Sequence, residues 1–228
     1  MASGRRGGAM TGPPGWHGSP NDAGAALAAE SARFASFGWM RGTSGNLSVV
    51  LTRDPLLLAV TASGRDKESL TPDDIVVVDA AGRPVSTGRA APASGRTPAA
   101  RPVAAQSAEA ALHARIVGLT GAGAVVHVHT VASVVAGRRW PQGVELADLE
   151  MLKGIGLPAT GEPVTLPVVP NSQDMAELGD WLQAAWNSRM PAAVVAGHGL
   201  YAWGHELLQA RHHTEVVQWL LEVMIAID

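Results

Sequence analysis

AVVHVHT, residues 124–130, is an apolar run of strand length that carries two histidines. Successive side chains of a β-strand alternate between its two faces, so His127 and His129 project from the same side, about 7 Å apart along the backbone. Two imidazoles on one face can converge on one metal ion. The alternative is a pair of strand histidines with no ligand. The flanking valines indicate a buried strand, where unpartnered imidazoles are costly, and this favours a metal site.

A third histidine, His198, lies late in the chain within AGHGL, residues 196–200. It follows the apolar run 192–196, which places it at the end of a strand, and the flanking glycines allow close approach. Three histidines with an open fourth position are the pattern of a catalytic zinc site. An all-histidine set also suits other divalent ions, and an ordinary turn residue is the alternative for His198.

The composition narrows the class of protein. The chain has 228 residues, 46% of them hydrophobic, which is ample for one domain with a sizeable core. Its net charge of −3 offers no basic surface for nucleic acid or an anionic membrane. The absence of cysteine excludes disulfides and thiolate-bound zinc. No apolar run approaches the roughly 20 residues of a membrane helix, and no signal peptide is visible, so we expect a soluble, cytoplasmic protein.

The pattern around the histidine strand mixes helices and strands. Residues 1–20 are rich in glycine and proline and are expected to be a disordered tail, and a domain follows over 21–228, interrupted by a flexible insertion at 82–106. Helices are expected over 25–37, from 107, over 174–186 and along the C-terminal stretch, and strands over 56–61, 75–79, 124–130, 164–169 and 191–196. This mixture predicts a layered α/β (α+β) domain and leaves the strand order open.

Two glutamates are candidates for proton transfer. Glu109 opens the helix expected from residue 107, directly before the histidine strand, although the helix dipole alone also explains a carboxylate there. Glu150 lies between hydrophobic residues in LEMLKG, residues 149–154. Partial burial by itself does not make a glutamate catalytic, so each position has a functional and a structural interpretation.

Two small polar turns offer backbone N–H groups and hydroxyls. They are GTSGN at residues 42–46 and TASG at residues 61–64. Such concave backbones suit a phosphate, although neither turn has the spacing of a P-loop or a dinucleotide fingerprint. Most turns of this composition bind nothing, so each is a weak signal on its own.

Taken in chain order, these segments resemble the class II aldolase/adducin family. The shared motifs are SGNLS at 44–48, Ser-Gly at 63–64, Ser-x-Glu at 107–109, His-x-His at 127–129 and His-Gly at 198–199. The resemblance implies a central antiparallel sheet flanked by helices, and a homotetramer with sites near subunit contacts. It implies one zinc ion per subunit on His127, His129 and His198. It maps a phosphate site onto Gly45, Asn46, Ser63, Gly64 and Ser107.

Within the family, EMLKGI at 150–155 and GHGLYAWG at 197–204 look like the dehydratases of methionine salvage rather than the sugar-phosphate aldolases. This implies a lyase that removes water from a phosphorylated ketose through a metal-stabilised enediolate, with Glu150 as the acid/base residue. Glu109 stands where the aldolases carry their catalytic glutamate and is the second candidate. The competing interpretations are an aldolase acting on a sugar phosphate of the fuculose- or rhamnulose-1-phosphate type, and a metal-free, adducin-like interaction module. Retention of the three histidines and both glutamates argues against the module.

Overall fold

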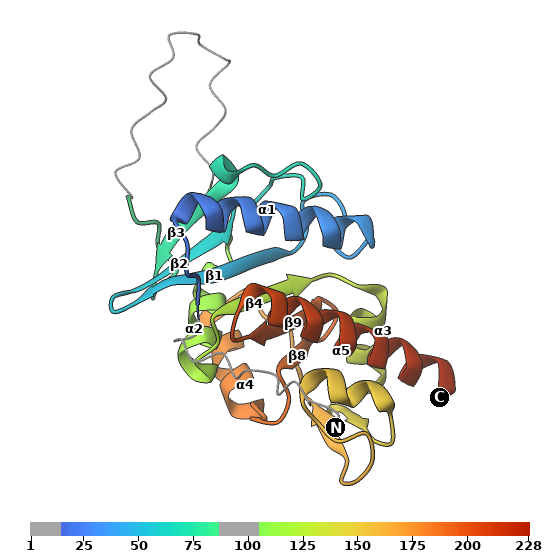
Figure 1. The fold of residues 1–228 in the computed structure, drawn as a ribbon. Helices are drawn as coiled ribbons and strands as arrows, with labels where there is room; N and C mark the ends of the chain where they lie inside the picture. Colours follow the sequence, from blue (N-terminus) through green and yellow to red (C-terminus); the bar gives the residue numbers. More distant parts are fainter. Residues whose placement is uncertain (1–14, 87–104) are drawn as a thin grey trace, which may run out of the picture.

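The computed structural model describes residues 15–86 and 105–228, which build a β-sheet with helices on both faces (Figure 1). The strands are β1 Asn46–Arg53, β2 Leu56–Thr61, β3 Ile75–Asp79, β4 Ala124–Val128, β5 Val144–Leu146, β6 Val164–Leu166, β7 Val168–Val169, β8 Ala192–Val195 and β9 Gly199–Gly204. The helices are α1 Pro20–Ser36, α2 Ala110–Thr120, α3 Val131–Arg139, α4 Met175–Ala185 and α5 Leu207–Ile227, with short 3-10 helices η1 Pro72–Asp74 and η2 Glu150–Ile155.

The main sheet has seven strands in the order β3-β2-β1-β4-β9-β8-β7. Neighbouring strands are antiparallel except for β7 and β8 at one edge. A separate ribbon pairs β5 with β6. The predicted central antiparallel sheet flanked by helices is therefore confirmed, and the strand order places β4, the strand with the two histidines, in the middle.

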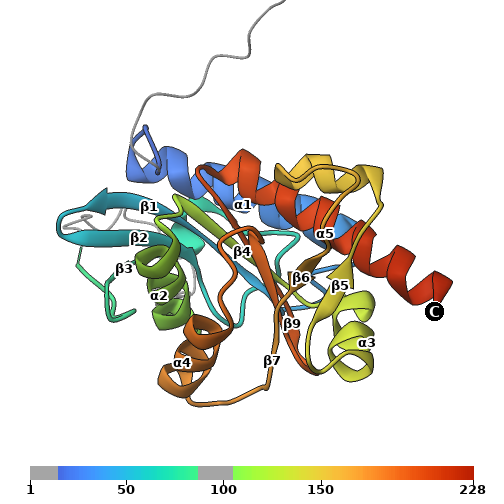
Figure 2. The same cartoon turned by 90° about the horizontal axis from the view of Figure 1, so that it is seen from below.

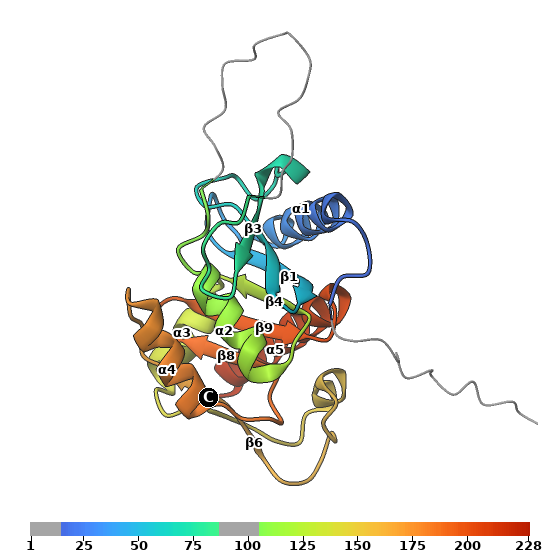
Figure 3. The same cartoon turned by 90° about the vertical axis from the view of Figure 1, so that its left-hand side faces the viewer.

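Each face of the sheet buries its own apolar cluster. Helices α1, α3 and α5 cover one face, and α2 and α4 cover the other (Figure 2 and Figure 3). Along β4 the side chains alternate as expected for a strand: Val126 packs into the first cluster and Val125 into the second. His127 therefore points to the face covered by α2, the helix that follows Glu109.

The main difference from the sequence prediction is β9, a six-residue strand hydrogen-bonded to both β4 and β8. Its terminal glycines are typical of turns and hide the strand in the sequence. Gly199 is required by packing, because a Cβ there would lie 2.4 Å from the Val128 carbonyl oxygen. The expected strand at 164–169 is divided into β6 and β7 around Pro167, which has no N–H to donate to a sheet.

The ordered domain begins earlier than the sequence predicted. The Trp16 N–H donates to the Val50 carbonyl at 2.8 Å. Ser19 caps α1 through a capping box with Asp22, and Pro20 is the first helical residue. The expected disordered tail at 1–20 is therefore wrong for residues 15–20, and residues 1–14 lie outside the described part of the chain.

The expected insertion at 82–106 is described only at its two ends, because residues 87–104 lie outside the described residues. At its start, the Val85 N–H donates to the Val77 carbonyl at 2.8 Å, so the first residues continue the edge of the sheet beside β3 and are not a free loop. Within residues 15–86 and 105–228, no helix combines the length and apolar character needed to cross a bilayer.

Candidate active site

The three histidines singled out in the sequence meet at one end of β4. His127 lies on β4, His129 directly after it, and His198 in the turn that joins β8 to β9. One ring nitrogen of each lies within 4.8 Å of the others. The Nε2 atoms of His127 and His129 are 2.8 Å apart. The structure therefore brings together histidines that are about 70 residues apart in the chain, as a metal site requires.

The orientation of His127 suits a metal ligand. Its ring is fully buried, and Nδ1 lies 3.1 Å from the Leu200 carbonyl oxygen, so Nδ1–H donates to that oxygen and Nε2 faces the cluster. Burial lowers the pKa of His127 to about 3, so the neutral imidazole prevails at neutral pH. Neutral imidazole is the form that binds metal ions.

The donor set fits a divalent metal ion. Two imidazole nitrogens at 2.8 Å present lone pairs to each other, and these repel unless a proton or a cation lies between them. Within the described residues, the group whose possible ligand atoms all lie within 4.8 Å of one another consists of these three imidazoles, and the carboxylate of Glu109 borders it. Such a set suits Zn²⁺ and leaves a position open for substrate.

Glu109 is the carboxylate beside the histidines. Its Oε1 lies 3.1 Å from His198 Nε2 and 3.5 Å from His127 Nε2. Burial alone would raise the pKa of Glu109, but His127 and the hydrogen bonds from His198 and Asn46 outweigh burial and hold that pKa well below its usual range. Glu109 is thus an ionised group able to accept a proton.

Asn46 orients Glu109. It is the first residue of β1 and lies directly opposite His127 in the strand pair, so both side chains lie on one face of the sheet. Its Nδ2 donates to Glu109 Oε2 at 2.5 Å. The sequence placed Asn46 in a phosphate site. Its amide N–H₂ group contacts Glu109, and its place in a phosphate site stays a prediction.

The other predicted phosphate residues lie in the two turns and before α2. Gly45 and Gly64 both have left-handed backbones, with φ of 74° and 66°. Ser63 and Gly64 are exposed, and no atom lies within 4 Å of a Cβ built on Gly64. Ser107 is buried, and its hydroxyl accepts from the Glu109 N–H at 3.2 Å. The turn at residues 61–64 therefore borders open space, which a ligand site requires.

We expect Gly45→Ala to lower the free energy of unfolding by about 1–3 kcal/mol. The substitution strains the left-handed backbone, and its Cβ would lie 2.7 Å from Met40 Cε and 2.8 Å from the His127 carbonyl oxygen. Urea unfolding followed by circular dichroism measures the loss. Gly64→Ala is the matched control, with a similar φ but open surroundings. An equal loss in both variants would show that the contact with Met40 and His127 is unimportant.

Glu150 is not brought to the histidines of its own chain. It begins η2 on the surface, with 77% of its side chain exposed, and its carboxylate pairs with Lys153 Nζ at 2.5 Å. Glu150 could therefore transfer a proton beside these histidines only if it came from a second copy of the chain.

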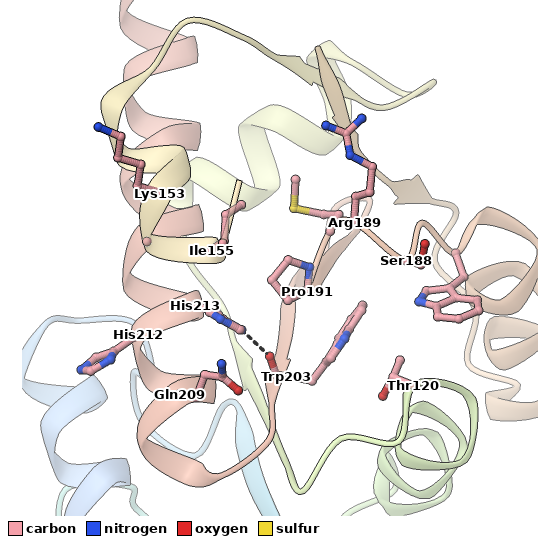
Figure 4. Close-up of a pocket in the computed structure, with 14 residues that line it drawn as sticks. Thr120, Lys153, Ile155, Ser188, Arg189, Pro191, Trp203, Gln209, His212 and His213 are labelled. Atoms are coloured by element: carbon pink, nitrogen blue, oxygen red, sulfur yellow. Dashed lines mark hydrogen bonds between the residues drawn. The ribbon is translucent and has the colours of Figure 1, made fainter. Parts of the chain in front are cut away.

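A separate cavity of about 470 Å³ lies beside η2 (Figure 4). Lys153, Arg189 and Trp203 are among the residues that line it, and His213 Nδ1–H donates to the Trp203 carbonyl at 2.6 Å. Neither Glu109 nor any of the three clustered histidines lines this cavity. It is therefore distinct from the histidine cluster.

Tyr201 is a residue of the site that the sequence reasoning missed. Its ring stacks on that of His127, with centroids 3.9 Å apart and an interplanar angle of 10°. Burial and the negative charge of Glu109 raise the pKa of the Tyr201 hydroxyl well above its usual range. The stacking follows from the pairing of Tyr201 with His127 across β9 and β4, and no local pattern reveals that register.

Comparisons with known proteins agree with this architecture. Residues 25–225 match the family described as Class II Aldolase and Adducin N-terminal domain. The chain is 35% identical over 189 residues to methylthioribulose-1-phosphate dehydratase of Sulfurihydrogenibium sp. (strain YO3AOP1), covering 82% of this chain and 81% of that protein. It is 34% identical over 196 residues to the protein of the same name from Geobacillus kaustophilus (strain HTA426), covering 85% and 87%.

Solved structures show the same fold at lower identity. L-fuculose-1-phosphate aldolase from Thermus thermophilus is similar with a TM-score of 0.66 and 22% identity, covering 91% of this chain and 95% of that chain. The sugar-phosphate aldolase from Thermotoga maritima is similar with a TM-score of 0.62 and 15% identity, covering 90% and 94%. The chain belongs to the class II aldolase and adducin family, as its motifs indicated.

Proposed function

We propose that the chain is a zinc-dependent methylthioribulose-1-phosphate dehydratase of methionine salvage, acting in the cytoplasm. It would convert 5-methylthioribulose 1-phosphate to 5-methylthio-2,3-dioxopentyl 1-phosphate and water. The names of relatives at 30–35% identity support this substrate. The observation that carries the proposal is the convergence of three histidines and an ionised glutamate at one end of β4.

His127, His129 and His198 would hold the zinc ion. A zinc ion bound there supplies a Lewis acid for the ketone of the substrate, which makes the adjacent C3–H more acidic. The buried position of His127 and its hydrogen bond to the Leu200 carbonyl keep its ligand nitrogen pointed at the site.

Dehydration needs one proton removed from C3 and one delivered to the C4 hydroxyl as it leaves. Loss of the C3 proton and the C4 hydroxyl gives an enol, which becomes the 2,3-diketone by tautomerisation. Glu109 lies against the histidines as an ionised carboxylate, so it suits the accepting role. Glu150 would then act as the second proton-transfer group.

Glu150 would reach the site from a second copy of the chain. Its exposed position on η2 leaves its carboxylate accessible to a neighbouring subunit. In a closed symmetric oligomer every subunit both gives and receives the same contact, so each site would obtain one Glu150. This arrangement supports the homotetramer that we propose, because it would explain why Glu150 lies away from its own histidines.

Glu150→Gln is expected to lower kcat by about 10²–10⁴-fold, the usual contribution of a general acid or base, with zinc content and folding unchanged. Mixing it with His127→Ala under conditions that exchange subunits is expected to restore about a quarter of wild-type activity, because random pairing makes about a quarter of the sites intact. The steady-state rate of the mixture measures this. Wild-type turnover in Glu150→Gln would make the residue structural, and the absence of complementation would place its action within one chain.

The product identifies the reaction. Zinc-loaded protein is incubated with 5-methylthioribulose 1-phosphate, and the products are analysed by mass spectrometry. Loss of one water without fragmentation is the expected result. Dihydroxyacetone phosphate would instead indicate cleavage of C3–C4, the reaction of an aldolase, and an unchanged substrate with zinc bound would mean a different substrate.

A further inference from the structure

Lys67 is a buried lysine that the proposed chemistry does not use. Lysine occurs only at positions 67 and 153 of the sequence, and Lys67 is 1% exposed. An ammonium group is costly to bury unless its donors are satisfied, so a fully buried lysine needs a structural or functional reason. It lies between two turns, here called the first turn (residues 42–46) and the second turn (residues 62–65).

The side chain of Lys67 joins these two turns. Its Nζ donates to the Thr43 carbonyl of the first turn at 2.9 Å. It also donates to the Arg65 carbonyl at 2.9 Å and the Ala62 carbonyl at 3.5 Å, both of the second turn. The Lys67 backbone N–H adds a bond to the Gly42 carbonyl at 3.3 Å. One residue therefore fixes the distance between the two turns, and the turns carry Gly45 and Gly64.

Lys67 also supplies a positive charge below the turns. Among residues 15–86 and 105–228, no carboxylate lies within salt-bridge distance of its ammonium, which is held by the carbonyls instead. A dianion bound to the backbone of the second turn would lie in the field of this charge.

We propose that Lys67 is a positioning residue for the phosphate of the substrate: it holds the two turns at the spacing that binds a phosphate and contributes a fixed positive charge beneath them. The identity of the phosphorylated substrate rests on the proposed function. The binding of phosphate as such does not, so inorganic phosphate serves as the probe.

In zinc-loaded protein, Lys67→Met is expected to weaken inorganic phosphate binding about 10-fold or more, measured by isothermal titration calorimetry. With the substrate, KM is expected to rise about 10–100-fold, and kcat to change by less than about 3-fold, because the residue acts on binding and not on the reacting carbons. Lys67→Arg keeps the charge and is expected to recover part of the phosphate affinity. Arg83→Met removes a charge from a side chain that is 76% exposed beside β3, and it should bind phosphate like the wild type.

The proposal is overturned if the wild type binds no phosphate, if Lys67→Met binds it as tightly as the wild type, or if Arg83→Met shows the same loss. Should Lys67→Met fail to fold, Lys67→Gln keeps donors for the carbonyls and removes the charge, and the loss of phosphate affinity is again expected. If the wild type does not dehydrate 5-methylthioribulose 1-phosphate while phosphate affinity still depends on Lys67, the proposed function fails and the role of Lys67 stands.

Discussion

Replacing His127 with alanine is expected to abolish bound zinc and to lower kcat/KM by about 10³-fold or more, since a Lewis acid is worth several kcal/mol in the transition state. His127 is the fully buried member of the cluster, and its hydrogen bond to the Leu200 carbonyl holds its Nε2 toward the other histidines. The two remaining imidazoles are partly exposed and cannot complete the site. Metal content from inductively coupled plasma mass spectrometry, measured beside the rate, gives the result.

His17→Ala is the control for this experiment, because His17 is an exposed histidine far along the chain from the cluster. It should keep wild-type zinc and activity. A full complement of zinc in His127→Ala would exclude His127 as a ligand. Zinc loss with a wild-type rate would exclude chemistry that depends on the metal.

Glu109→Gln is expected to lower kcat by about 10²–10⁴-fold with zinc retained. Glutamine has the same shape and keeps an oxygen for the Asn46 hydrogen bond, but it cannot accept the C3 proton. Because the Glu109 pKa is held well below its usual range, the wild-type carboxylate stays ionised through mildly acidic pH. A fall in rate on the acid side of the pH profile would therefore report another group, and stopped assays from about pH 5 to 8 test this.

Glu162→Gln is the matched control for Glu109→Gln, since it makes the same change at an exposed position. Its kcat should equal that of the wild type. Near-normal dehydration by Glu109→Gln, together with an inactive Glu150→Gln, would leave Glu109 as a structural carboxylate and Glu150 as the sole proton-transfer group.

Local periodicity was enough to place His127 and His129 on one face of a strand, whereas their meeting with His198 was expected from the family resemblance. His127 and His129 share a face because a strand repeats every two residues, and this holds whatever the strand order is. The His198 turn was recognisable from its flanking glycines and the apolar run before it. Helices α1, α2, α4 and α5 and most strands of the sheet followed from the same short-range patterns, whereas α3 was not predicted.

Contacts set by strand register and by distant segments could not be predicted in this way. β9 has the glycines of a turn, so the stacking of Tyr201 on His127 could not be foreseen from the sequence. Lys67 stands in a polar stretch that indicates an exposed loop, and its burial depends on a turn more than 20 residues earlier in the chain. Glu150 lies among apolar residues, yet η2 turns its carboxylate outward.

The histidine cluster and the segments expected to contact the substrate lie in parts of the molecule that differ in stability. A strand paired on both sides is among the last parts of a domain to open to solvent, so the backbone that carries His127 is well protected. The second turn and η2 are short and partly exposed, and substitutions at their exposed positions cost the sheet little. Substrate preference can therefore change over evolutionary time through substitutions in the second turn and η2, while the histidines keep their positions on and beside the central strand.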